Sequence, residues 1–93
     1  MRALTWDEFA GAAGTVYQVA CGDERFELTL DRAEEVPSAG REGGSFRLEF
    51  LGPFEPILPQ AIYPFCHGED AMDIFIVPIG RTSAGTRYEA VFY

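Results

Sequence analysis

The chain has 93 residues, which is enough for one domain but not for a second hydrophobic core. Fifteen acidic residues against seven arginines and no lysine give a formal net charge of −8, which disfavours nucleic acids and anionic membrane surfaces as partners. The hydrophobic share of 47% is too high for a disordered chain, and no apolar run is long enough to span a membrane as a helix.

The N-terminus and the cysteines bear on the cellular compartment. Asp7 and Glu8 stand where the apolar stretch of a secretory signal should begin, so we expect a cytoplasmic protein, with export inside a larger assembly left open. Cys21 and Cys66 lie far apart and lack the paired spacing of a disulfide framework or a metal site. In a reducing compartment they should be two free, mostly buried thiols.

Residues 5–13 are predicted to form one short helix. Thr5 and Glu8 have the S/T-x-x-E spacing of a capping box, in which each side chain can satisfy the backbone amide of the other residue. Trp6 and Phe9 then share one helical face by their three-residue spacing. This aromatic face needs another part of the fold to cover.

From Thr15 onward the hydrophobic period changes to two, the period of strands that bury one face. Residues 45–51 show it clearly, with Phe46, Leu48 and Phe50 predicted to point inward and charged residues between them. The predicted strands are residues 15–21, 25–35, 45–51, 61–67, 72–79 and 87–93. The first two should pair as a hairpin across a glycine-containing turn.

The segments between the strands differ in character. Residues 37–44 predict a flexible loop, and residues 80–86 predict a second polar loop. Residues 52–60 carry three prolines, which exclude an interior strand, while their apolar side chains predict an ordered loop packed on the body. Pro78 places the end of its strand at a sheet edge or a bulge.

Together these elements predict a mainly β fold that occupies residues 1–93 as a single domain. Six short antiparallel strands with frequent turns are typical of a small barrel or a barrel-like sandwich. We favour a barrel with the short N-terminal helix over its open end, because closure removes the exposed strand edges.

Residues 66–70 hold the densest group of reactive side chains, with a thiol, the only imidazole and two carboxylates. Cys66 and His67 are adjacent, so on a strand they point to opposite faces, which argues against a joint metal site and against a nucleophile paired with its base. No other spacing suggests a catalytic, cofactor-binding or metal-binding site. We therefore expect no enzyme and no cofactor, with a metal- or thiol-dependent enzyme at these two residues as the least favoured alternative.

The aromatic residues raise a question about the surface. If the alternation holds, they cannot all face the core: Tyr17, Phe54, Tyr63, Phe65 and Tyr93. One interpretation is that two small layers and the proline-rich loop bury them. The other is an aromatic contact patch, because tyrosine and phenylalanine are enriched at the centres of protein interfaces.

Several blocks follow one another along the chain: Trp6-Asp7-Glu8-Phe9, Gly14, Phe46-x-Leu48-x-Phe50-x-Gly52-Pro53, Leu58-Pro59-Gln60-x-Ile62-Tyr63, Phe75-Ile76-Val77-Pro78-Ile79-Gly80 and Arg87-Tyr88-Glu89-Ala90-Val91-Phe92. This order resembles an uncharacterised family of small bacterial β-domains that look like companions of phage tail-collar and tail-fibre-like proteins. Ala61 departs from the family pattern, in which glycine is expected. The resemblance implies an assembly role in a tail-like or fibre system, and it brings no catalytic residue or cofactor with it.

We therefore predict a non-enzymatic protein-interaction or assembly module that binds a protein partner. The predicted partner-binding residues are Phe54, Ile57, Leu58, Gln60 and Tyr63. The alternative from another class is a barrel whose interior binds a small apolar or carbohydrate ligand, which requires a cavity that side chains do not fill.

Overall fold

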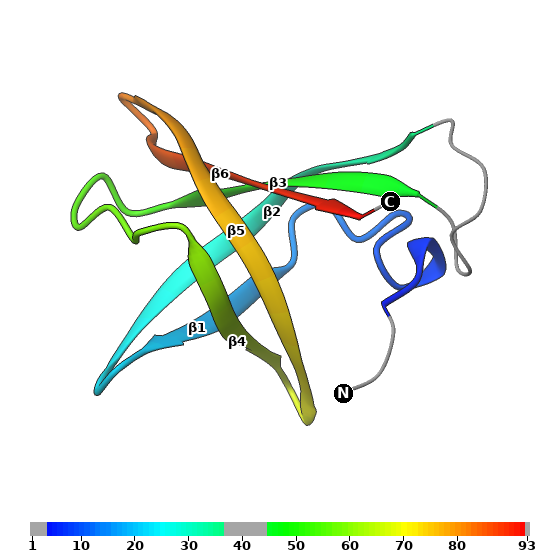
Figure 1. Cartoon of the computed structure of the whole chain (residues 1–93), viewed down its shortest axis with the longest axis horizontal. Coiled ribbons are helices and arrows are strands. Elements are labelled where there is room, and N and C mark those ends of the chain that lie inside the picture. Colours follow the sequence, from blue (N-terminus) through cyan, green and yellow to red (C-terminus); the bar gives the residue numbers. More distant parts are fainter. Residues whose placement is uncertain (1–3, 37–44, 93) are drawn as a thin grey trace.

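The computed structural model describes residues 4–36 and 45–92, and it shows six antiparallel strands that close into a barrel (Figure 1). The strands are β1 (Val16–Cys21), β2 (Glu24–Glu35), β3 (Phe46–Gly52), β4 (Ala61–His67), β5 (Asp70–Thr82) and β6 (Gly85–Phe92). Their order around the barrel is β1-β2-β3-β6-β5-β4, and β1 closes the ring by pairing with β4. The predicted mainly β fold is confirmed, and the sheet closes as a barrel.

The two-residue alternation places the core as the sequence predicted. Phe46, Leu48 and Phe50 are fully buried along β3, and the predicted hairpin of β1 and β2 pairs Val16 with Thr29 at one end and Cys21 with Glu24 at the other. Side chains with almost no exposed surface occupy the interior: Tyr88, Phe9, Phe46, Phe50, Phe65, Leu28, Leu30, Leu48, Ile74, Ile76, Val19 and Thr86. A barrel of this size is thus filled by its own side chains, as is typical of small barrels.

The question about the aromatic residues is settled mostly in favour of burial. Tyr17, Tyr63 and Phe65 belong to the core, whereas Phe54 is half exposed. The ring of Phe65 lies 5.0 Å from that of Phe50 and 5.9 Å from that of Tyr17, measured between centroids. Tyr93 lies outside the described residues. These aromatic side chains are buried because the inward-facing side chains of all six strands share one interior in the closed barrel.

The predicted helix over residues 5–13 is wrong in extent, because the structure has only a 3-10 helix at Trp6–Glu8. Its capping box is present, with the amide of Thr5 donating to the Glu8 carboxylate at 2.8 Å. Gly11 adopts a φ of 74°, a left-handed conformation that ends the helical path. No helix within residues 4–36 and 45–92 is long and apolar enough to cross a membrane.

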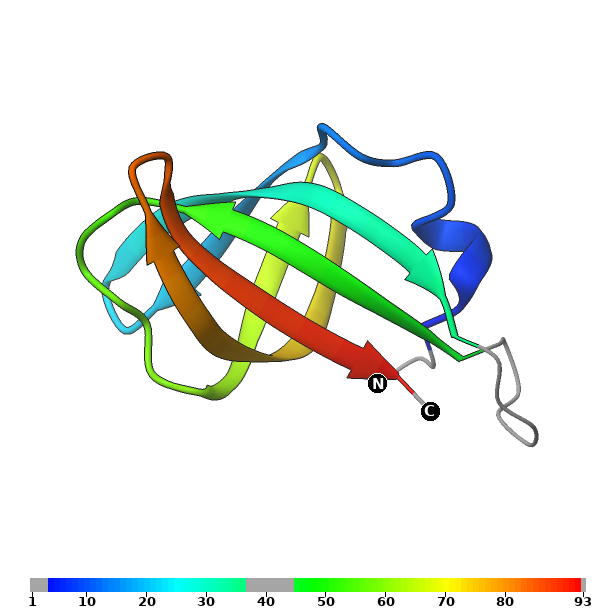
Figure 2. The same cartoon turned by 90° about the horizontal axis from the view of Figure 1, so that it is seen from above.

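The N-terminal segment caps one end of the barrel, and the loop between β3 and β4 lies at the other end (Figure 2). Phe9 is fully buried at the capped end, with ring centroids 5.6 Å from Phe46 and 6.4 Å from Phe92. The N-terminal segment thus performs the expected covering role with two aromatic rings, since the ring of Trp6 also lies 6.0 Å from that of Phe46. The two ends of the barrel are therefore closed by different segments of the chain.

The hairpin of β5 and β6 is longer than predicted. Residues 80–86 are mostly strand, since β5 continues to Thr82 and pairs there with Gly85. Pairing continues because the irregularity predicted at Pro78 is a bulge between Pro78 and Gly80, and the register resumes beyond it. The predicted loop over residues 37–44 lies outside the described residues.

Candidate functional site

The loop between β3 and β4, residues 53–60, is held against the end of the barrel by one buried and one partly buried hydrogen bond. The amide of Leu58 donates to the hydroxyl of Tyr88 at 2.9 Å, and the Leu58 side chain is only 3% exposed. The hydroxyl of Tyr63 donates to the carbonyl of Pro59 at 2.6 Å, and burial raises the pKa of this hydroxyl. These contacts give an irregular, proline-rich segment a defined shape, as the sequence predicted for an ordered loop.

The outer side of this loop presents apolar side chains next to an arginine from β5. Phe54 is 52% exposed and Ile57 is 44% exposed. The guanidinium of Arg81 lies 3.8 Å from the centre of the Phe54 ring and donates to the Phe54 carbonyl at 2.9 Å. The hydroxyl of Thr86 donates to the same carbonyl at 3.2 Å. The backbone of Phe54 is therefore held from two strands, and its exposed ring is in contact with Arg81.

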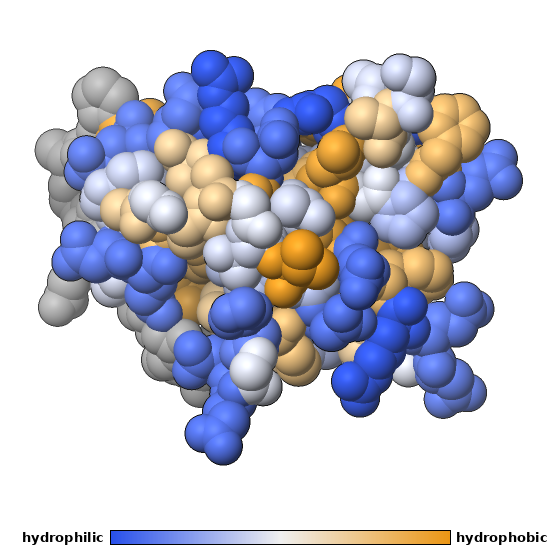
Figure 3. Space-filling view, turned by 180° about the vertical axis from the view of Figure 1, so that it is seen from behind, coloured by the Kyte–Doolittle hydropathy of each residue, from blue (hydrophilic) through white to orange (hydrophobic). Residues whose placement is uncertain are grey.

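A hollow of about 490 Å³ lies beside the exposed ring. Its lining residues are Glu55, Pro56, Ile57 and Arg81. The Arg81 guanidinium stands 3.4 Å from the Glu55 carboxylate, a pair that is open to water and contributes little to stability. In Figure 3, apolar atoms reach the surface among hydrophilic ones at the edge of the molecule where this loop lies. The hollow has the chemistry to receive an apolar side chain bordered by charge.

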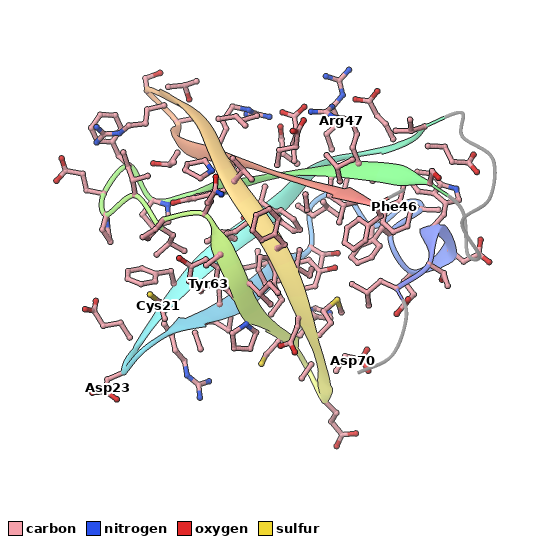
Figure 4. All side chains as sticks on the ribbon, in the orientation of Figure 1. Cys21, Asp23, Phe46, Arg47, Tyr63 and Asp70 are labelled. Carbon is pink, nitrogen blue, oxygen red and sulfur yellow. The ribbon has the colours of Figure 1, made fainter. Side chains whose placement is uncertain are left out.

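Two of the five predicted partner-binding residues must be corrected. Leu58 and Tyr63 are buried in the core, so their side chains are not available to a partner, while Phe54, Ile57 and Gln60 are exposed. The physical reason is that the loop folds back over the barrel end and uses Leu58 as its anchor. Figure 4 shows the side chain of Tyr63 on β4 at the same end of the barrel.

Arg81 was missed by the sequence analysis. It is 27 residues from Phe54 along the chain and belongs to a segment that the sequence predicted to be a polar loop. Only the length of the β5–β6 hairpin brings its guanidinium over the ring. Nothing in the local sequence marks this contact.

The residues around Cys66 and His67 come together differently from a catalytic or metal site. Cys21 and Cys66 are both free and half-buried. His67 follows Tyr63 and Phe65 along the inward row of β4, and its ring lies 5.8 Å from that of Tyr17. Within the part of the chain that the structure describes, no group of three or more His, Cys, Asp and Glu side chains is arranged to hold a metal ion.

The outer wall over β2, β3 and β6 carries a network of ion pairs centred on Glu49, which is 9% exposed. Its carboxylate lies 2.9 Å from the Arg47 guanidinium and 3.0 Å from that of Arg87. Figure 4 shows Arg47 pointing away from the barrel. Burial raises the pKa of Glu49, but the hydrogen bonds and positive charges of the two arginines outweigh it, so the pKa is lowered overall. This wall is polar and internally paired.

The wall over β4 and β5 is apolar by comparison. Ile62 and Phe75 are paired across the two strands, and their side chains are 61% and 49% exposed. They match Phe54 and Ile57 in exposure and chemistry, but they lie on regular strands and do not line the hollow beside the loop. They therefore provide a matched comparison for the loop surface.

Comparison with known proteins places the chain in a family. No curated protein and no solved structure matches it. The family model that matches covers residues 4–92, nearly the whole chain. The protein therefore belongs to the family described as "Domain of unknown function (DUF6916)".

Proposed function

We propose that this protein is a non-enzymatic interaction module that binds a protein partner through the outer side of the β3–β4 loop. We call this the loop surface, and its residues are Phe54, Glu55, Pro56, Ile57, Gln60 and Arg81. The observation that carries the proposal is the fixed presentation of Phe54 and Ile57, two large apolar side chains, beside a hollow.

Single exposed apolar residues are common on protein surfaces, so exposure alone would not support a binding site. Three features distinguish Phe54 and Ile57. They are close together on one loop, one buried and one partly buried hydrogen bond hold that loop, and the hollow beside them offers an anchoring position. A rigid surface loses little conformational entropy on binding, which leaves more of the contact energy for affinity.

The proposed partner is a protein segment that places an apolar side chain in the hollow and carries basic residues around it. The formal net charge of −8 attracts such a segment and raises its rate of association. The resemblance to companions of tail-collar and tail-fibre-like proteins suggests an assembly of that kind as the setting. We favour this function over a ligand inside the barrel because buried side chains occupy the interior.

The test compares two double variants in affinity capture from the native lysate, with the captured proteins identified by mass spectrometry. Phe54→Thr with Ile57→Thr removes the apolar part of the loop surface. Ile62→Thr with Phe75→Thr removes a similar exposed apolar area from the β4–β5 wall. All four side chains are about half exposed, so both variants should fold with nearly unchanged melting temperatures.

We expect a protein that binds the unmodified chain and the wall variant but is lost with the loop variant. Central apolar contacts contribute roughly 2 kcal/mol or more each, so the loss should exceed about tenfold in affinity. A partner retained by the loop variant or lost with the wall variant would show that the loop surface is not the binding site. Recovery of no protein specific to the unmodified chain would count against the interaction itself.

A further inference from the structure

A second hollow, of about 330 Å³, lies at the opposite end of the barrel, where the N-terminal segment approaches β1 and the β4–β5 hairpin. Its lining residues are Glu8, Ala12, Thr15, Tyr17, His67, Asp70 and Met72. The volume is at the lower end of small-molecule sites, which span roughly 300 to 1,000 Å³. We call it the mouth site. It shares no residue with the loop surface and is independent of the proposed function.

Tyr17 supplies the observation that points to a ligand. Its side chain is only 3% exposed, yet within residues 4–36 and 45–92 its hydroxyl has no hydrogen-bond partner. The hydroxyl oxygen is open to the hollow that Tyr17 lines, because among the described residues the fully buried side-chain nitrogen or oxygen without a partner is Ser45 Oγ. Burial raises the pKa of this hydroxyl, and the carboxylates of Glu8 and Asp70 raise it further. The neutral hydroxyl can therefore accept a hydrogen bond from a group entering the hollow.

His67 and Asp70 add further acceptors beside Tyr17. The Nδ1 atom of His67 is 3.3 Å from the carbonyl of Val16. A carbonyl can only accept, so in the neutral ring Nδ1 carries the hydrogen and Nε2 is left as an acceptor. The Asp70 carboxylate forms no ion pair with any of the described residues, and Figure 4 places it at the N-terminal start of β5 near this end of the barrel.

We propose that the mouth site binds a protonated alkyl amine. The phenol oxygen, the imidazole nitrogen and the Asp70 carboxylate are all acceptors, and an ammonium group offers three donors with a positive charge. The aromatic rings of Tyr17 and His67 provide a face for the adjoining methylene groups. An anion would meet the carboxylates of Glu8 and Asp70, and the Glu8 carboxylate is already engaged by the amide of Thr5.

The site suits an organic cation better than a metal ion. No described group of three or more His, Cys, Asp and Glu side chains converges as a metal site would require. The amine could belong to a free small molecule or to a lysine side chain of a peptide, and both offer the same chemistry. The chain itself contains no lysine, so a lysine side chain in the site must come from another molecule.

The test is a titration of the full chain followed by amide chemical shifts in ¹H–¹⁵N spectra at constant ionic strength. The probes are butylammonium chloride, its neutral counterpart 1-butanol, and a lysine residue blocked at its amino and carboxyl groups. We expect saturable shifts grouped at Tyr17, His67 and Asp70 with one or both amines and none with 1-butanol. The amine that binds more tightly identifies the source.

Three variants decide whether the named groups hold the amine. Tyr17→Phe keeps the ring in the core and removes the hydroxyl, and Asp70→Asn removes the charge at an exposed position. Each should weaken amine binding roughly tenfold, since a hydrogen bond to a charged group contributes about 1.5–3 kcal/mol. Glu69→Gln is the matched control, because it removes an equal charge from the neighbouring residue, which does not line the hollow. It should change affinity less than about twofold.

Four results would overturn the proposal. They are the absence of saturable shifts with both amines, shifts spread over the whole acidic surface, equal binding of 1-butanol, and equal weakening by Glu69→Gln and Asp70→Asn. Spectra of each variant without ligand establish that the barrel is intact, so a loss of binding cannot be confused with unfolding. The loop-surface variants provide a separate readout, because they should leave amine binding unchanged.

Discussion

Replacing Tyr88 with phenylalanine tests how the loop surface is held. The Tyr88 ring is fully buried, and its hydroxyl accepts the amide hydrogen of Leu58 at 2.9 Å in a buried hydrogen bond. Tyr88→Phe keeps the ring and leaves the amide of Leu58 without a partner. An unsatisfied buried donor costs about 1–3 kcal/mol, so the free energy of unfolding should fall by that amount.

The matched control is Tyr63→Phe, which removes a hydroxyl from the same end of the barrel. That hydroxyl donates to the carbonyl of Pro59, and the bond is only partly buried. Water can replace the lost donor there, so the expected cost is smaller, about 0.5–1.5 kcal/mol. For a domain of this length each 1 kcal/mol corresponds to roughly 4–8 °C in melting temperature. Tyr88→Phe should therefore melt lower than Tyr63→Phe by several degrees.

Two measurements decide the outcome. Urea unfolding followed by circular dichroism gives the free-energy difference between the variants. Hydrogen exchange of the Leu58 amide reports the bond itself and should accelerate in Tyr88→Phe but not in Tyr63→Phe. The reasoning is refuted if Tyr88→Phe is no less stable than Tyr63→Phe, or if protection of the Leu58 amide is unchanged.

Two further substitutions test the ion-pair network and the tight β5–β6 turn. Because the pKa of Glu49 is lowered in the folded state, its stabilisation is present above the unfolded value of about 4.3 and is lost as pH falls through the lower folded value. Glu49→Gln should therefore destabilise the protein at pH 7 by about 1–3 kcal/mol but by much less near pH 2, in urea unfolding at both pH values. Gly85 has a φ of 141°, and a Cβ atom there would lie 2.0 Å from the carbonyl oxygen of Gly52. Gly85→Ala should cost well over 1 kcal/mol and lower the melting temperature in calorimetry, and an unchanged transition would contradict this contact.

Local patterns in the sequence determined most of the strands and the inward rows. Alternation over residues 45–51 identified Phe46, Leu48 and Phe50 as core, and all three are fully buried. This works because the side chains of a strand alternate between two faces, so a pattern within a few residues already separates the two sides of the sheet. An edge or a bulge at Pro78 was predicted for a similarly local reason, since proline cannot donate to the ladder, and the structure has the bulge.

The N-terminal helix shows where local propensity fails. The capping box was read correctly from Thr5 and Glu8, but the helix ends at Glu8 instead of continuing to residue 13. Packing determines this end, because Phe9 is buried against the stacked rings of Phe46 and Phe92 and the chain then turns at Gly11. A few residues of helical preference amount to less free energy than the burial of one aromatic ring.

The candidate sites depended on the tertiary structure more than the strands did. The sequence located an ordered loop with apolar residues, yet it could not separate the buried Leu58 from the exposed Ile57. That difference depends on Tyr88 and Arg81, which approach the loop from β6 and β5 across the barrel. Likewise, the mouth site combines β1, β4, β5 and the N-terminal segment. Periodicity carries information about neighbours along one strand, whereas these contacts arise only when distant strands close into a ring.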